Sequence, residues 1–181
     1  MSEPPEIDEP VELAPYDQAW AAQFESEKKR IACALGPSAA AIEHIGSTAV
    51  PGMTAKPVID IQAGFEQERL PEIWAPALMA LGYEYLGEAG VPERWYFRNR
   101  TGPAHVNLHA VRFRGAHWRN NLFVRDYLRL NSDWAAEYVA AKQRALESSR
   151  MLKGYSSAKS EFITAMIRRA ADYFSSTTIV R

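Results

Sequence analysis

The residues best suited to chemistry lie in one segment, HIGSTAVPGMTAKPVIDI, which spans residues 44–61. It contains a turn whose hydroxyls and backbone N–H groups can hold a phosphate, formed by Gly46, Ser47 and Thr48. Asp60 follows 13 positions after Ser47 in the apolar run VIDIQ, where an ionised carboxylate is costly unless it is paired or bound to a cation. Lys56 stands just before that run. The segment predicts a site for a phosphorylated ligand, although a Gly-Ser-Thr tripeptide alone is also typical of an ordinary turn.

Polar partners for Asp60 are expected on two other stretches. Glu43 and His44 precede the turn and point to opposite faces of a strand, so only one can face the carboxylate, and the sequence leaves open which. A later strand has three polar residues on one face, which are His105, Asn107 and His109. The two histidines are about 13 Å apart in an extended chain, too far to share a metal ion, so only one can join a site. The alternative is a structural histidine that hydrogen-bonds to a neighbour.

Basic side chains four residues apart recur in the helical stretches. Arg125 and Arg129, in LFVRDYLR, lie one turn apart, which suits capture of a phosphate. A solvated basic face with an aspartate partner is the alternative. Lys142 and Lys159 each follow a tyrosine by four positions, which predicts either a phosphate contact or packing of the lysine stem on the ring. In residues 94–98, RWYFR, alternation puts the Trp and Phe toward a core and the Arg and Tyr side chains on the opposite face.

The elements that must position these residues are predicted from breakers and periodicity. Strands are expected over residues 11–13, 39–45, 58–65, 83–86, 94–100 and 105–112, and helices over 17–35, 70–81, 118–130, 133–149 and 157–174. Helices that flank one mixed, mostly antiparallel sheet, followed by a helical C-terminal region, make an α+β fold. Residues 1–10 are expected to be a flexible arm without chemistry, 11–174 a single domain and 175–181 a tail.

Composition excludes several classes of protein. The chain has 181 residues, 47% hydrophobic and 24% charged, and a net charge of −1, so it can bury a core and carries no bulk positive field for nucleic acid. The single cysteine, Cys33, cannot form an internal disulfide. The acidic, proline-rich N-terminus is unlike a signal peptide, and no apolar run approaches the roughly 18 residues of a membrane span. We therefore expect a cytoplasmic protein with no membrane partner, whose oligomeric state the sequence leaves open.

Several of these motifs together resemble the signature of the GrpB family, also called UPF0157. The resemblance begins with the segment 44–61 and continues through VNLHA at 106–110, LFVRDYLR at 122–129, Tyr138 with Lys142, and Tyr155 with Lys159 and Phe162. It runs from Val11 to about Ile167. The resemblance implies a nucleotidyltransferase-like fold, in which a Gly-Ser turn faces a carboxylate-bearing strand that holds a divalent metal against a nucleoside triphosphate. The family has no generally established reaction, so membership implies no single activity.

The resemblance also implies roles for individual residues. Asp60 would hold Mg²⁺ or Mn²⁺, His109 in the NLH triplet would be its polar neighbour, and Glu43 would be a second ligand or a general base. Groups that would bind nucleotide or phosphate are Gly46, Ser47, Thr48, Lys56, Arg125, Lys142 and Lys159. The superfamily usually has a second acidic residue where this chain has Gln62, so one metal ion is expected rather than two.

Three functions remain open on this sequence. The first is a nucleotidyltransferase-like protein that binds a nucleotide or phosphorylated small molecule with a divalent metal. The second is a non-catalytic ligand-binding or partner module that has lost the acidic set, for which Gln62 is the evidence. The third is another metal-dependent reaction on a nucleotide-like metabolite. Related domains are joined to a dephospho-CoA kinase in some proteins, which hints at coenzyme metabolism.

Overall fold

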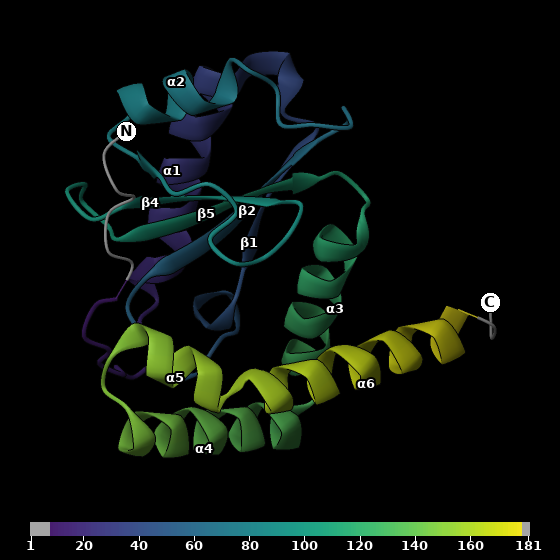
Figure 1. Cartoon of the computed structure of the whole chain (residues 1–181). Helices are drawn as coiled ribbons and strands as arrows, with labels where there is room; N and C mark the ends of the chain where they lie inside the picture. Colours follow the sequence, from purple (N-terminus) through teal and green to yellow (C-terminus); the bar gives the residue numbers. More distant parts are fainter. Residues whose placement is uncertain (1–7, 179–181) are drawn as a thin grey trace.

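A five-stranded mixed sheet forms the centre of the computed structural model, which describes residues 8–178 (Figure 1). Its strands are β1 (Ala41–Ile45), β2 (Ile59–Phe65), β3 (Glu84–Tyr85), β4 (Arg94–Asn99) and β5 (Val106–Arg112), in the order β1-β2-β5-β4-β3. Strands β2 and β5 are parallel, and the other neighbours are antiparallel. The predicted α+β class with a mixed sheet is confirmed.

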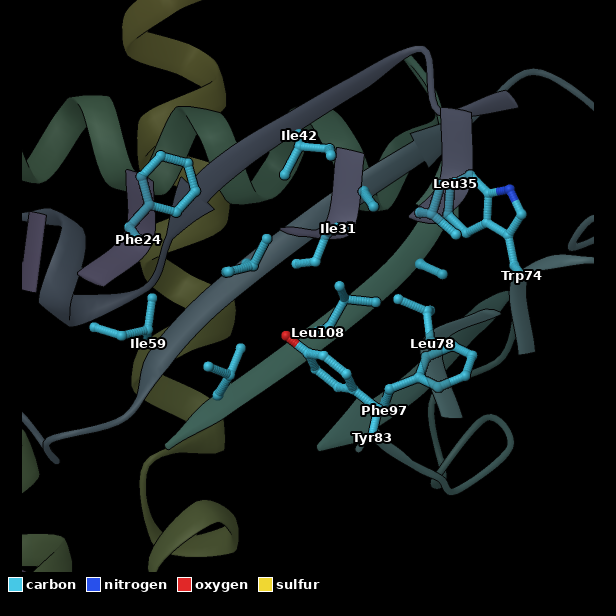
Figure 2. Packing of buried hydrophobic residues seen from close by; sticks show 14 of the residues in the cluster. Phe24, Ile31, Leu35, Ile42, Ile59, Trp74, Leu78, Tyr83, Phe97 and Leu108 are labelled. Carbon is cyan, nitrogen blue, oxygen red and sulfur yellow. The ribbon is translucent and has the colours of Figure 1, made fainter. Parts of the chain in front are cut away.

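One face of the sheet is apolar because alternate residues of each strand point to it. Helices α1 (Ala19–Leu35) and α2 (Trp74–Ala80) cover this face. Figure 2 shows the resulting core around Leu108 and Phe97. Ile61, Leu108 and Phe97, from three neighbouring strands, have no exposed surface. Each such side chain stabilises the fold by about 1.5–3 kcal/mol. The apolar face anchors the sheet and leaves its other face for polar groups.

The other side of the molecule is helical. Helix α3 (Ala116–Leu130) packs beside the sheet, and α4 (Ser132–Ser148), α5 (Leu152–Ala158) and α6 (Ser160–Thr178) form a layer across one end of it (Figure 1). A second apolar cluster joins this layer to the loop between β1 and β2, and contains Val50, Met53, Leu128, Tyr138 and Met166. Among residues 8–178, no helix has the length and apolarity needed to cross a membrane.

Three predicted elements differ from the structure. The helix predicted over 157–174 is two helices that meet at Lys159, and the first was missed because Gly154 weakens its helical pattern. The strand predicted over 11–13 is absent, and only isolated bridges form on either side of it, at Pro10 and Ala14. Helix α6 continues to Thr178, so residues 175–178 are helical rather than a tail, and 179–181 lie outside the described residues. A single domain over 11–174 stays a prediction.

Candidate functional site

The polar face of the sheet brings together side chains that are far apart in the sequence. Asp60 on β2 is in register with Asn107 on β5, and His109 on β5 is in register with Tyr96 on β4. Side chains in register on neighbouring strands point to the same face, so these four lie together. The face that alternation predicted for Asp60 is therefore continuous across three strands.

A cavity of about 600 Å³ lies against this polar face. Its volume falls within the roughly 300–1,000 Å³ of small-molecule sites. The residues that line it are Ser47, Thr48, Lys56, Asp60, Ala89, Val91, Arg94, Tyr96, Asn107, His109, Lys142, Leu152, Lys153, Tyr155, Ser156, Lys159 and Ile163. Five of them are lysine or arginine, and Asp60 is the only carboxylate among these described wall residues. The cavity therefore suits an anionic ligand.

The turn after β1 needs glycine because it touches Asp60. Gly46 has φ +70° and ψ −168°, a region that is open essentially to glycine alone. A Cβ atom there would lie 2.5 Å from Asp60 Oδ2. Ser47, which follows, lines the cavity. The Thr48 hydroxyl is buried, lies 3.0 Å from His44 Nε2 and donates to the carbonyl of Val58, so it serves the local fold.

Asp60 is held as a carboxylate by its neighbours. Asn107 Nδ2 donates to Asp60 Oδ1 at 2.8 Å, and His109 Nε2 lies 3.7 Å from the same oxygen. Burial raises the pKa of Asp60, but His109, Lys56 and Asn107 together lower it to about 2. A group this acidic stays ionised at neutral pH and is a weak general base.

Two hydrogen bonds from neighbouring side chains fix the orientation of Asn107. Its Oδ1 accepts hydrogen bonds from the Tyr96 hydroxyl at 2.7 Å and from Arg100 Nη2 at 2.8 Å. The amide nitrogen is therefore directed at Asp60. Beside it, burial lowers the pKa of His109 in spite of the opposing charge of Asp60, so the imidazole is neutral at pH 7 and can accept a proton.

Lys142 and Lys159 reach the cavity from the helical layer. Lys142, on α4, is 1% exposed, donates to the carbonyl of Thr54 and lies over the Tyr138 ring, 4.8 Å from its centroid. Burial and the charge of Lys159 lower its pKa to about 7. Lys159 Nζ lies 4.4 Å from the centroid of the Tyr155 ring, and burial lowers its pKa while Asp60 opposes that shift. The lysines do pack on the tyrosine rings, but they do so in the cavity wall rather than on the surface.

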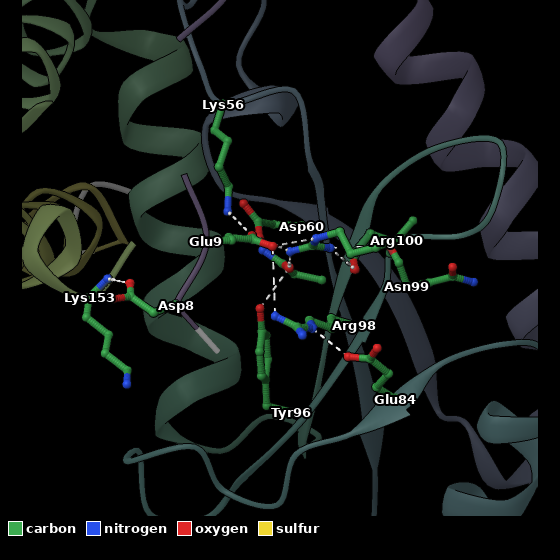
Figure 3. A network of polar contacts seen from close by, with 12 residues as sticks. Asp8, Glu9, Lys56, Asp60, Glu84, Tyr96, Arg98, Asn99, Arg100 and Lys153 are labelled. Atoms are coloured by element: carbon green, nitrogen blue, oxygen red, sulfur yellow. Dashed lines mark hydrogen bonds and ion pairs between the residues drawn. The ribbon is translucent and has the colours of Figure 1, made fainter. Parts of the chain in front are cut away.

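Lys56 lies between two carboxylates. Asp60 is one of the charges that act on it, and its Nζ is 3.3 Å from Oε1 of Glu9. Glu9 is also bound by Arg100, as Figure 3 shows. These ion pairs tie Glu9 to the sheet, whereas the expectation that residues 1–10 carry no chemistry stays a prediction, and residues 1–7 lie outside the described part of the chain. No signal in the sequence connects Glu9 to Arg100, which is 91 positions away. The position of Arg100 itself has a signal, because it follows residues 94, 96 and 98 at the same spacing of two and so falls on the polar face.

The register of strand β1 shows which of Glu43 and His44 shares the face of Asp60. Glu43 is in register with Gln62 and shares the face of Asp60, whereas His44 points to the opposite face and stacks on Phe24 at 4.7 Å between ring centroids. Yet Glu43 does not line the cavity, because Arg125 Nη1 binds its carboxylate at 2.8 Å.

Arg125 was predicted to bind phosphate, and the structure directs it elsewhere. It binds Asp126 as well as Glu43 and does not line the cavity. The other basic residues expected to bind phosphate, Lys56, Lys142 and Lys159, do line it. Its neighbour Arg129 donates to the carbonyl of Ala49. Both arginines fasten α3 to β1 and the turn.

The donor set does not fit a resident metal ion. Gln62 has no exposed surface, donates to the carbonyl of Trp118 at 3.3 Å and accepts from Asn121 at 3.0 Å, so helix α3 covers the position where a second acid would stand. Among the described residues, no three His, Cys, Asp or Glu side chains gather as metal ligands. Asp60, with one oxygen held by Asn107, would hold Mg²⁺ only together with water and the phosphates of a bound ligand, which usually complete the octahedral shell of this ion in proteins.

Comparison with known proteins gives consistent results. The sequence profile of the family described as GrpB protein matches residues 10–169. UPF0157 protein YqkA of Bacillus subtilis is 34% identical over 154 residues, which are 84% of this chain and 45% of YqkA. A dephospho-CoA kinase of Mycolicibacterium paratuberculosis is 30% identical over 196 residues, 93% of this chain and 48% of that protein. The chain thus spans about half the length of these two relatives.

A solved structure agrees with the sequence matches. The crystal structure of conserved protein GrpB from Enterococcus faecalis is 30% identical, with a TM-score of 0.81, and the alignment covers 90% of this chain and 99% of that one. The family profile covers most of the sequence and the fold matches over nearly the same span, and on both grounds this chain belongs to the GrpB family.

Proposed function

We propose that this protein binds a nucleotide or another phosphorylated small molecule in the cavity on the polar face of the sheet. The observation that carries the proposal is the convergence of Lys56, Lys142 and Lys159, from three separate parts of the chain, on one cavity beside the turn at Ser47. Lys142 is fully buried and the other two lysines are partly buried, and burial lowers the pKa of all three, so a bound anion would offset the desolvation of their charged forms. Phosphate oxygens supply such a partner.

The cavity wall also offers surface for an uncharged ring or chain. Ala89, Val91 and Leu152 are apolar wall residues, and Tyr96 and Tyr155 offer aromatic surfaces. A ligand with a charged phosphate end and a less polar end would match both parts. The relative named dephospho-CoA kinase is consistent with a phosphorylated small molecule, but this chain spans only 48% of that protein, so its activity is not transferred.

Nucleotidyl transfer is the second candidate function. The observation that favours it is the contact of the Gly46 turn with Asp60 across neighbouring strands, which is the arrangement that the superfamily resemblance implies. Under this candidate, neutral His109 would accept a proton from an acceptor group while Asp60 stabilises the imidazolium that forms.

Calorimetric titration of ATP into the full chain tests the binding proposal, with Mg²⁺ in one series and EDTA in the other. We expect saturable binding in both, and an affinity about 10 to 100 times weaker in Lys159→Met, since a hydrogen bond to a charged group contributes about 1.5–3 kcal/mol. Lys29→Met removes the same charge from the exposed side of α1 and serves as the matched control. Absence of binding in the native protein, or equal losses in both variants, would contradict the proposal.

A further inference from the structure

A second group of cations surrounds the carboxylate of Glu9 beside the cavity (Figure 3). Arg100 binds it in a bidentate way, with Nη2 2.8 Å from Oε1 and Nε 3.0 Å from Oε2. Lys56 Nζ lies 3.3 Å from Oε1. Arg98 Nη1 lies 3.8 Å from Oε2, while its Nε binds Glu84 at 2.6 Å. A guanidinium fork with two further cations is an arrangement that binds phosphate as well as carboxylate.

The cations and the carboxylate come from different parts of the fold. Arg98 lies on β4, Arg100 follows the end of that strand, and Lys56 precedes β2, so all three are positioned by the sheet. Glu9 comes instead from the segment before α1, which is attached to the helical layer. The amide of Leu152 donates to the carbonyl of Glu9 at 2.9 Å, and the amide of Lys153 donates to Asp8 at 2.8 Å. The sheet therefore provides the cationic receptor, and the carboxylate of Glu9 enters it from a separate segment of the chain.

This receptor is continuous with the large cavity. Lys56 lines both that cavity and a smaller one of about 290 Å³, whose wall includes Glu9 and Arg100. Arg100 Nη2 also donates to Asn107, which in turn holds Asp60. An anionic group next to a phosphate held in the large cavity would thus meet Lys56 and Arg100 without any change in the sheet.

We propose that Lys56, Arg98 and Arg100 form a second anion subsite, which takes a further phosphoryl group of a polyphosphorylated ligand and which Glu9 occupies until that group replaces it. This inference rests on the proposed function, because Lys56 belongs to both sites. Burial raises the pKa of Glu9, but Arg100 and Lys56 lower it to about 2, as expected of a receptor that selects the charged form of its occupant. Glu9 competes with the ligand, so removing its charge should tighten the binding of polyphosphate.

Calorimetric titration of inorganic tripolyphosphate into the full chain tests this competition. We expect Glu9→Ala to bind it about tenfold more tightly than the native protein, the size of effect that one charged hydrogen-bond partner gives. Glu9→Gln keeps the shape of the side chain and should show a smaller gain of the same sign. Glu25→Ala removes an equal charge from an exposed residue of α1, away from both cavities, and should leave the affinity within about twofold. Adding Arg100→Met to Glu9→Ala should abolish the gain.

The outcomes separate this inference from the proposed function. If Lys159→Met weakens binding but neither Glu9 variant tightens it, the cavity binds phosphate and the second subsite is wrong. If the native protein binds no tripolyphosphate while Glu9→Ala binds it in an Arg100-dependent way, the subsite stands and the proposal for the large cavity falls. Weaker binding in both Glu9 variants, with unchanged urea midpoints, would show that Glu9 helps to hold the ligand and would overturn the competition.

Discussion

Substitution of Gly46 by alanine tests the contact between the turn and the carboxylate. The new Cβ atom would lie 2.5 Å from Asp60 Oδ2 and 3.0 Å from Asp60 Cβ, so the aspartate would have to move. Movement weakens the hydrogen bond from Asn107, which is worth about 1.5–3 kcal/mol because its acceptor is charged. The backbone at φ +70° adds about 1–3 kcal/mol of strain for any residue with a Cβ. We expect a loss of about 3–5 kcal/mol in the free energy of unfolding.

Gly52→Ala is the matched control for this substitution. Gly52 also has a positive φ, +78°, but a Cβ there would meet nothing within 4 Å, so it incurs only the backbone strain of about 1–2 kcal/mol. Urea unfolding followed by tryptophan fluorescence gives both values. A Gly46→Ala protein that is no less stable than Gly52→Ala would refute the close contact between the turn and Asp60. The same variant should also bind ATP more weakly, since it displaces the carboxylate in the cavity wall.

Three other changes give distinct results. Gln62→Glu should destabilise the fold by about 3 kcal/mol at pH 7 and by less at pH 5, because a carboxyl group that faces the Trp118 carbonyl fits only when it is protonated. Titration of this variant with Mn²⁺ should detect no added ion site. Arg125→Met should lower the urea midpoint but leave ATP affinity unchanged, whereas an affinity loss like that of Lys159→Met would place Arg125 in the site. The pKa of His44 is lowered to about 4 by burial, so the unfolded chain binds more protons below pH 6.5 and stability should fall by about 2 kcal/mol from pH 7 to pH 5. His44→Gln should show a smaller fall.

The sheet and its polar face were predictable from the sequence because strand alternation is a local signal. The spacing of Asp60, Gln62, Asn107 and His109 placed these side chains on the correct faces, and the breakers around Gly46 marked the turn. Alternation also predicted that Trp95 and Phe97 would meet the core, which the structure confirms.

The sequence did not predict which basic residues would line the cavity and which would form ion pairs elsewhere. Arg125, on α3, and Lys159, between α5 and α6, both occupy family-like positions, yet one binds Glu43 and the other reaches the cavity. The difference depends on how α3 and the later helices pack against the sheet, and a helical period does not encode that packing. Glu9 was missed for the same reason, since an ion pair with Arg100 joins residues that only the tertiary fold brings together.

A crystal of the full chain soaked with ATP gives the most direct test of the central claim, that the cavity on the polar face of the sheet binds phosphate. We predict electron density for a phosphate group within about 3 Å of the ammonium nitrogens of Lys56 or Lys159, beside the turn at Ser47, as expected for charge-assisted hydrogen bonds. Density for the nucleotide on another surface of the molecule, with the cavity holding only water at a saturating ATP concentration, would contradict the account.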